Sequence, residues 1–211
     1  MYFSLLIVGA PFVGHDANDH NLLLKGAPFY NAISSTARVT SGIMCGHMAG
    51  SAKLIFLCGK MAAGKSTLAR ELADRENAVL LVQDDFVTAL FPGEITDIPS
   101  FVNRYTRLKN ALTPHICVLL SKRISVVLDF AAATKAQRAW FRELIERTQV
   151  EHELHFVDES DAVCKTQLRD RSSGLPAGTR WTTEEDFEAI NAYFQPPSED
   201  EKFNVVRHER L

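Results

Sequence analysis

The chain lacks a strong excess of charge: its 211 residues carry a formal net charge of −3. Because surfaces that bind large polynucleotides are usually basic, the net charge does not favour such a surface, although it leaves room for a small basic channel. The four cysteines, at positions 45, 58, 117 and 164, lie far apart and form no C-x-x-C pair. This arrangement favours free thiols and a cytoplasmic protein.

The N-terminal region lacks a membrane-spanning or secretory signal. Phe3–Val8 is apolar, but it is far shorter than the about 20 residues that span a bilayer. It also lacks the basic segment of a signal peptide. Residues 9–50 show little helical or strand periodicity. We therefore expect residues 1–51 to be a poorly patterned extension, with Met48 as a possible true start, and residues 52–211 to form the folded domain.

The rest of the composition is ordinary. Apolar residues make up 46% and charged residues 23% of the chain, which is typical of soluble globular proteins. The length suits one α/β domain with some additional chain. No internal repeat and no second domain are evident.

The most specific motif is the run Gly59-Lys60-Met61-Ala62-Ala63-Gly64-Lys65-Ser66-Thr67, which follows an apolar segment and matches G-x-x-x-x-G-K-[ST]. In this pattern, glycines let backbone N–H groups wrap around phosphate oxygens, and the next helix points its positive dipole end at the same anion. Lys65 would reach the β- and γ-phosphates, and the Ser66 hydroxyl would bind Mg²⁺. The alternative is an ordinary glycine turn between a strand and a helix.

Two carboxylates follow the next apolar run. Residues 78–82 predict a second buried strand, and Asp84 and Asp85 come directly after it. Open α/β sheets bind ligands at the carboxyl ends of their strands, so both carboxylates are candidate site residues. The alternative for Asp85 is that it only caps the helix that follows.

A third strand, predicted over 124–130, closes on Asp129. Four apolar residues followed by aspartate are the usual form of a Walker-B element, whose carboxylate holds the Mg²⁺ shell. Phe130 stands where motor and transport ATPases typically have a glutamate that polarises water, which argues against a hydrolytic machine. The chain has no Asn-Lys-x-Asp motif, which argues against a GTPase switch.

Three helix starts are predicted from capping residues. Residues 100–120 are expected to be helical, with Ser100 as the cap and Pro114 as a break or kink near the end. Thr134 is expected to cap the next helix. Thr182 is expected to open a later helix through a capping box with Glu185.

The last part of the chain predicts two strands and a lid. Residues 153–157 and 203–206 are expected to be the fourth and fifth strands. Between them, a helix over 161–171 carries Arg169 and Arg171 and leads into a glycine-containing loop. Arginines at a closing lid would neutralise charge on a transferring phosphoryl group. The alternative is that they only complement the dipole at the helix C-terminus.

Together these motifs resemble the small P-loop kinase-like ATP-binding proteins of the AAA-type group that includes zeta toxins, chloramphenicol phosphotransferases and polynucleotide kinases. The resemblance covers about residues 53–208. It implies a P-loop NTPase three-layer sandwich: a parallel sheet of order 2-3-1-4-5, flanked by helices, with a small lid. It also implies transfer of the γ-phosphoryl group of ATP to a hydroxyl group, with an aspartate after the second strand as the acceptor base. That aspartate corresponds to Asp84 or Asp85, and Asp84 is preferred because it lies nearer the strand.

We therefore expect a monomeric or weakly dimeric phosphotransferase that uses ATP and Mg²⁺ on an unidentified hydroxyl acceptor, without a membrane partner. In this hypothesis, residues 59–67 bind the nucleotide, Ser66 and Asp129 hold the metal, and residues 1–47 are dispensable for nucleotide binding. Two alternatives remain open. One is a polynucleotide 5′-hydroxyl kinase, and the other is a non-catalytic protein whose ATP orders the lid for a partner.

Overall fold

The structure, a computed structural model, describes residues 51–173 and 183–209. Its sheet has five parallel strands in the order β2-β3-β1-β4-β5, as the resemblance implied. The elements follow one another as β1 (Lys53–Gly59), α1 (Lys65–Arg75), β2 (Val79–Val82), α2 (Gln83–Leu90), α3 (Ile98–Ser121), β3 (Val126–Asp129), α4 (Lys135–Thr148), β4 (Glu151–Val157), α5 (Asp161–Ser173), α6 (Glu184–Asn191), a 3₁₀ turn (Glu199–Glu201) and β5 (Val205–His208).

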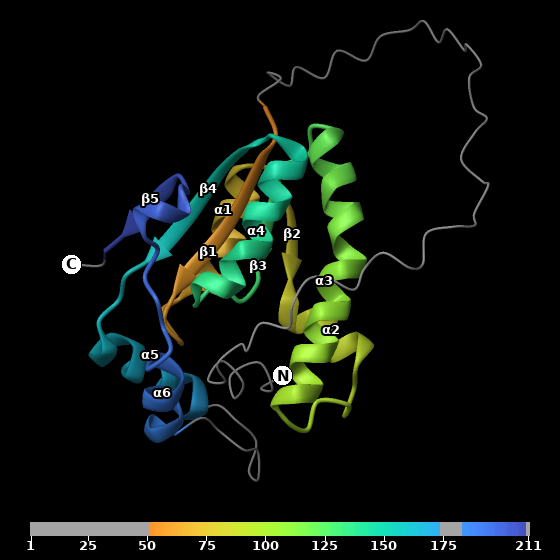
Figure 1. The fold of residues 1–211 in the computed structure, drawn as a ribbon. Helices are drawn as coiled ribbons and strands as arrows, with labels where there is room; N and C mark the ends of the chain where they lie inside the picture. The colour runs from red at the N-terminus through yellow and green to blue at the C-terminus, as the bar shows by residue number, and fades with distance from the viewer. Residues whose placement is uncertain (1–50, 174–182, 210–211) are drawn as a thin grey trace, which may run out of the picture. The chain divides into compact units, whose positions relative to one another are not determined.

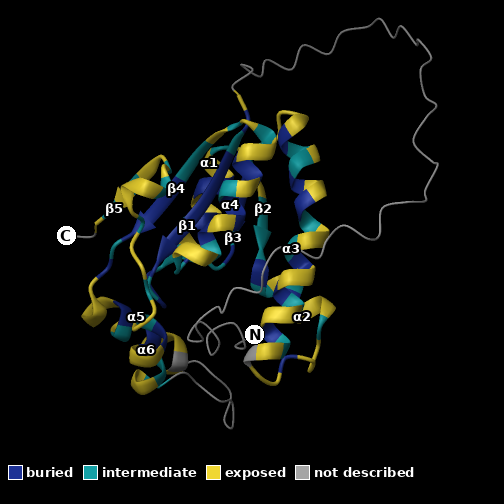
Figure 2. Ribbon diagram, in the orientation of Figure 1, coloured by how far each residue is buried: buried dark blue, intermediate teal, exposed yellow. Residues whose placement is uncertain are grey.

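The central strand β1 is buried from Leu54 to its end because helices cover both faces of the sheet. Ile55 and Leu57 face α1 and pack with its small and aliphatic residues. Leu54 and Phe56 point to the opposite face and join the core that α3 and α4 cover. Figure 2 shows this strand as a dark band between helices whose outer surfaces are exposed. A continuous apolar run is what a strand buried on both sides requires.

The carboxyl ends of four strands lie together at one end of the sheet. Because all strands are parallel, their carboxyl ends lie on the same side of the sheet. Val82 at the end of β2 is the register partner of Asp129 at the end of β3. Gly59 at the end of β1 is the partner of Val157 at the end of β4. The predicted phosphate loop and the predicted carboxylates therefore share this edge.

Helix α2 begins at Gln83, and its N-cap is Val82. The alternative in which Asp85 caps this helix is therefore wrong. Asp84 and Asp85 lie in the first helical turn. Their carboxylates are stabilised there by the positive end of the helix dipole.

Helix α3 begins two residues earlier than predicted, with Asp97 rather than Ser100 as its N-cap. The Asp97 carboxylate accepts the Ser100 N–H at 2.8 Å, and the Ser100 hydroxyl accepts the Asp97 N–H at 3.1 Å. Of the two expected effects of Pro114, a break or a kink, the break is wrong, since α3 continues to Ser121. Burial of Ile116 and Leu120 beyond the proline contributes about 1.5–3 kcal/mol each, which offsets the missing hydrogen bond.

In the later part of the chain, two elements begin one or two residues after their predicted starts. Helix α6 uses Thr183 and Asp186 as its capping box instead of Thr182 and Glu185, because two overlapping pairs have the required spacing. Strand β5 begins at Val205, where its pairing with Leu154 of β4 starts, rather than at Phe203. The Phe203 ring packs edge-on against Phe56, with 5.2 Å between the ring centroids.

Several predictions lie outside the described residues. These are the N-terminal extension up to residue 50, including Met48, and the loop 174–182 between α5 and α6. Within the described ranges, no helix is both long and apolar enough to cross a bilayer.

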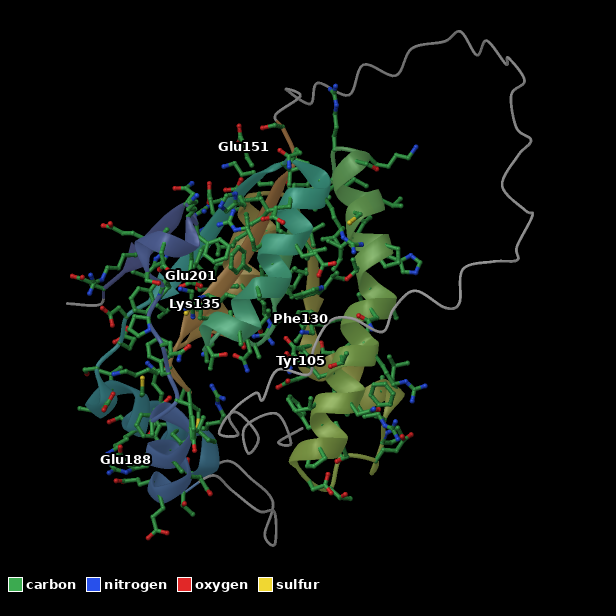
Figure 3. All side chains as sticks on the ribbon, viewed as in Figure 1. Tyr105, Phe130, Lys135, Glu151, Glu188 and Glu201 are labelled. Atoms are coloured by element: carbon green, nitrogen blue, oxygen red, sulfur yellow. The ribbon has the colours of Figure 1, made fainter. Side chains whose placement is uncertain are left out.

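A buried ion pair ties the chain before β5 to α4. Arg138 donates from Nε and Nη2 to the two carboxylate oxygens of Glu201, both at 2.7 Å. The two side chains are only 1% and 5% exposed. Arg138 also donates to the carbonyl oxygens of Ala132 and Gln195, at 3.0 and 2.8 Å. The pair therefore joins three segments around the start of α4, where Figure 3 labels Glu201 close to Lys135.

Glu201→Gln is expected to lower the free energy of unfolding by about 3–5 kcal/mol, because the buried guanidinium loses its counter-charge. Urea denaturation followed by circular dichroism measures this. The matched control is Asp200→Asn, which removes an exposed pair with Lys135 and should have a much smaller effect. Equal losses of the free energy of unfolding in the two variants would contradict the stabilising role of the buried pair between Arg138 and Glu201.

The same pair predicts acid sensitivity. Burial by itself raises the pKa of Glu201, but the hydrogen bonds and charge of Arg138 and the Ser198 N–H bring the pKa below its usual value. A lowered folded-state pKa contributes stability above the unfolded-state pKa, and this stability is lost as the pH falls through the folded-state pKa. In Glu201→Gln, unfolding should therefore depend less on pH below about 4.5 than in the wild type.

Candidate phosphate-binding site

The loop between β1 and α1 has the backbone shape of an anion-binding nest. Gly59 (φ 153°), Ala62 (φ 58°) and Gly64 (φ 89°) all have positive φ values. Alternation of right- and left-handed residues turns successive N–H groups toward one point. Ala62 is a non-glycine residue in the left-handed region, which costs about 1–3 kcal/mol and is typical of functional sites.

Gly59 is required by the close approach of β4. A Cβ atom at this position would lie 2.6 Å from the carbonyl oxygen of Val157, far inside van der Waals contact. The register of β1 and β4 places these two residues side by side. The first glycine of the motif therefore lets the loop pass over the end of the neighbouring strand.

Lys65, the first residue of α1, folds its side chain back under the loop. Its ammonium group donates to the carbonyl oxygens of Gly59 at 2.9 Å and of Lys60 at 2.6 Å. Burial lowers the pKa of Lys65, and the nearby carboxylate of Asp129 partly opposes that shift. The positive charge therefore lies under the loop, close to the predicted metal ligand.

The start of α1 is open to an anion. A helix leaves its first N–H groups without intrahelical acceptors. The N-cap, Gly64, has no side chain to accept them. Ser66 and Thr67 are exposed in the first turn. The predicted nucleotide-binding residues 59–67 thus run from the end of β1 through the loop into the first turn of α1.

The carboxylates lie at the carboxyl ends of the next two strands of the sheet, in β3 and in the helix that follows β2. Asp129 is half-buried at the end of β3. Asp84 is half-buried and Asp85 is exposed in the first turn of α2. The β2–β3 register puts Asp129 next to Val82, two residues before Asp84.

Gln83 connects these two strand ends, and the sequence did not suggest it. Its side chain is 3% exposed, and its Oε1 atom accepts the N–H of Ala131 at 2.9 Å. This hydrogen bond fixes the start of α2, and therefore Asp84, relative to the end of β3. The available signal was a polar residue immediately after a buried strand, which alone does not identify the partner.

The two predicted lid arginines have different surroundings. Arg169 is exposed, and its Nε donates to Glu184 of α6 at 3.0 Å. Arg171, one helical half-turn further on, is also exposed, and its charge lowers the pKa of Lys65. The structure therefore pairs Arg169 with α6, while the link between Arg171 and Lys65 is electrostatic.

The donor set suits a magnesium ion that phosphate oxygens help to bind. Within the described part of the chain, no group of three His, Cys, Asp or Glu side chains could hold a metal ion alone. Mg²⁺ usually keeps several waters and uses one or two protein oxygens plus substrate phosphates. The Ser66 hydroxyl and the Asp129 carboxylate fit that requirement.

A family model described as an AAA domain matches residues 54–197. No curated protein matches the chain. A presumed kinase from Chloroflexus aurantiacus superposes with a TM-score of 0.58 at 18% identity, over 75% of this chain and 88% of that chain. Kti12 from Chaetomium thermophilum in complex with ADP-AlF3 gives a TM-score of 0.55 at 13% identity, over 74% and 88%. A sugar kinase from Janibacter sp. HTCC2649 gives 0.52 at 15% identity, over 74% and 84%. These likenesses concern the fold, and they confirm the P-loop kinase-like architecture.

Gly59→Ala is expected to lower the free energy of unfolding by about 3 kcal/mol or more, because backbone strain adds to a clash with a carbonyl oxygen. Gly93→Ala is the matched control. Gly93 also has a positive φ of 74°, but nothing lies within 4 Å of its added Cβ. Its expected loss is about 1 kcal/mol, measured by urea denaturation as for Gly59→Ala. Equal losses would mean that the approach of Val157 does not constrain the loop.

Proposed function

The chain belongs to the AAA-domain family, and on that premise we propose that it is an ATP-dependent phosphotransferase. In this proposal it moves the γ-phosphoryl group of Mg²⁺-bound ATP to a hydroxyl group of a small molecule. The observation that carries the proposal is the loop 59–64, whose positive-φ residues form a nest above the Lys65 ammonium group.

In the proposed complex the loop amides and Lys65 bind the polyphosphate. The lysine already lies under the loop, so binding exchanges its two carbonyl acceptors for phosphate oxygens with little rearrangement. The Ser66 hydroxyl and Asp129 hold the Mg²⁺ ion, which neutralises phosphate charge when bound. The neighbour crystallised with ADP-AlF3 supports nucleotide binding by a protein of this fold.

Asp84 is the proposed acceptor base. The Gln83 side chain holds it at the edge of the sheet beside Asp129. Asp84 accepts the proton of the acceptor hydroxyl as the new O–P bond forms, and the γ-phosphoryl group leaves ADP. In this proposal Arg171 neutralises charge on the transferring group, which is supported by its electrostatic effect on Lys65. For Arg169 to do the same, it must first leave Glu184.

One observation argues against hydrolysis, and another favours a small acceptor. Phe130 follows Asp129, is 3% exposed and lies 5.3 Å from Trp140 between ring centroids, so this position offers no carboxylate to polarise water. Figure 3 labels Phe130 beside Tyr105 of the same core. A sugar kinase among the similar structures also supports a small hydroxyl acceptor.

Lys65→Met is expected to weaken binding of Mg²⁺-ATP about 10- to 100-fold, the range for losing hydrogen bonds from a charged group. Isothermal titration calorimetry measures the affinity, and thermal melting checks that the variant is folded. Lys122→Met is the control. It removes an exposed lysine at the C-terminal end of α3, near the end of the sheet at which the strands begin. Wild-type affinity in Lys65→Met would contradict the proposed site.

Asp84→Asn is expected to reduce phosphoryl transfer about 10²- to 10⁴-fold, as for loss of a general base. Its ATP affinity should stay within about threefold of the wild type. The assay incubates γ-labelled ATP with a panel of hydroxyl compounds, first sugars and then an oligonucleotide with a free 5′-hydroxyl. Asp85→Asn is the matched control and should retain transfer. If no compound is phosphorylated while ATP binds tightly, the protein is a nucleotide-gated binding protein instead.

A further inference from the structure

The side of the phosphate-binding loop that faces away from the nest is buried. Met61, Ala62 and Ala63 are 6%, 7% and 1% exposed. They form one apolar cluster with residues of β4, α5 and α6: Val157, Cys164, Leu168, Phe187 and Ile190. Three consecutive residues of the loop therefore rest on α5 and α6, which lie together at this end of the sheet (Figure 1).

A hydrogen bond joins α6 to this loop. The N–H of Met61 donates to Oδ1 of Asn191, the last residue of α6, at 3.1 Å. A second polar contact joins Lys60 to Asp161 at the start of α5, but it is an exposed ion pair. Exposed pairs contribute little, whereas the Asn191 contact is partly buried and acts on the backbone of the loop itself.

The orientation of the Asn191 carboxamide follows from this contact. A carboxamide has an acceptor oxygen and a donor nitrogen. Its Nδ2 atom is buried and has no hydrogen-bond partner within residues 51–173 and 183–209. A flipped carboxamide would set a donor against the Met61 N–H. The bond to Met61 therefore fixes which side of the group faces the loop.

We propose that Asn191 is a positioning residue for the phosphate-binding loop. It holds the Met61 peptide, and with it the left-handed Ala62, in the conformation that aims the following amides at phosphate. This role rests on the proposed function. Because linkage between two sites is reciprocal, bound polyphosphate in turn stabilises α6 against the loop. Asn191 thereby couples α6 to nucleotide affinity without touching the nucleotide.

The test is Asn191→Ala in the full chain, with Mg²⁺ and a non-hydrolysable ATP analogue as the probe. The expected result is an affinity about fivefold weaker, the change that one hydrogen bond of ordinary strength supplies. In the ligand-free protein, the Met61 amide should exchange with solvent faster, as measured by NMR. Asn191→Asp keeps an acceptor oxygen, so slow exchange of the Met61 amide should be retained.

Thr183→Ala is the matched control, because it removes the N-cap at the other end of α6 and leaves Asn191 in place. Equal weakening of the probe by Thr183→Ala would show that only the stability of α6 matters and would overturn the proposal. If the wild type binds the probe and Asn191→Ala binds it with the same affinity, the positioning role of Asn191 is overturned, whereas the proposed function is not. If the wild type does not bind the probe, both the proposed function and the positioning role of Asn191 are contradicted.

Discussion

The loop between β1 and α1 passes over the end of β4 at a distance that leaves no room for a Cβ atom at residue 59. This close approach sets where the chain turns, and the turn sets where α1 begins. The Lys65 ammonium group then binds the carbonyl oxygens of Gly59 and Lys60 and holds the loop from below. The nest, the helix N-terminus and the Lys65 charge all lie next to this contact between two paired parallel strands.

Charged groups from several elements surround this contact between β1 and β4. Burial disfavours the charged form of Lys65, and Asp129 at the end of β3 opposes that effect. Arg171 of α5 adds a second positive charge near the loop, while Asp84 lies on the far side of Asp129 in α2. Charged groups of both signs on α1, β3 and α5 thus interact around the loop.

The sequence predicts those parts of the fold that depend on local pattern. The apolar runs predicted the strands, and the glycine-lysine motif predicted the loop and the start of α1. Overlapping capping signals gave two helix starts that were wrong by one to three residues, at Ser100 and Thr182, because neighbouring residues offer equivalent caps. The strand order came from family resemblance, since no local pattern specifies which strands pair.

Contacts between distant residues could not be predicted in this way. Gln83 binds Ala131, Asn191 binds Met61 and Arg138 binds Glu201, each across 48 to 130 residues of sequence. None belongs to a recognisable motif in one sequence, because their partners are defined only by the folded sheet. These side chains hold the site in shape, whereas the motif residues are those expected to touch the nucleotide.

A crystal structure of the full chain with magnesium and a non-hydrolysable ATP analogue tests the central claim most directly. The account predicts that the β- and γ-phosphates lie in the nest of residues 59–67, with Lys65 bound to phosphate oxygens and Ser66 bound to the metal. Nucleotide density elsewhere, with Lys65 still bound to the carbonyl oxygens of Gly59 and Lys60, would contradict it.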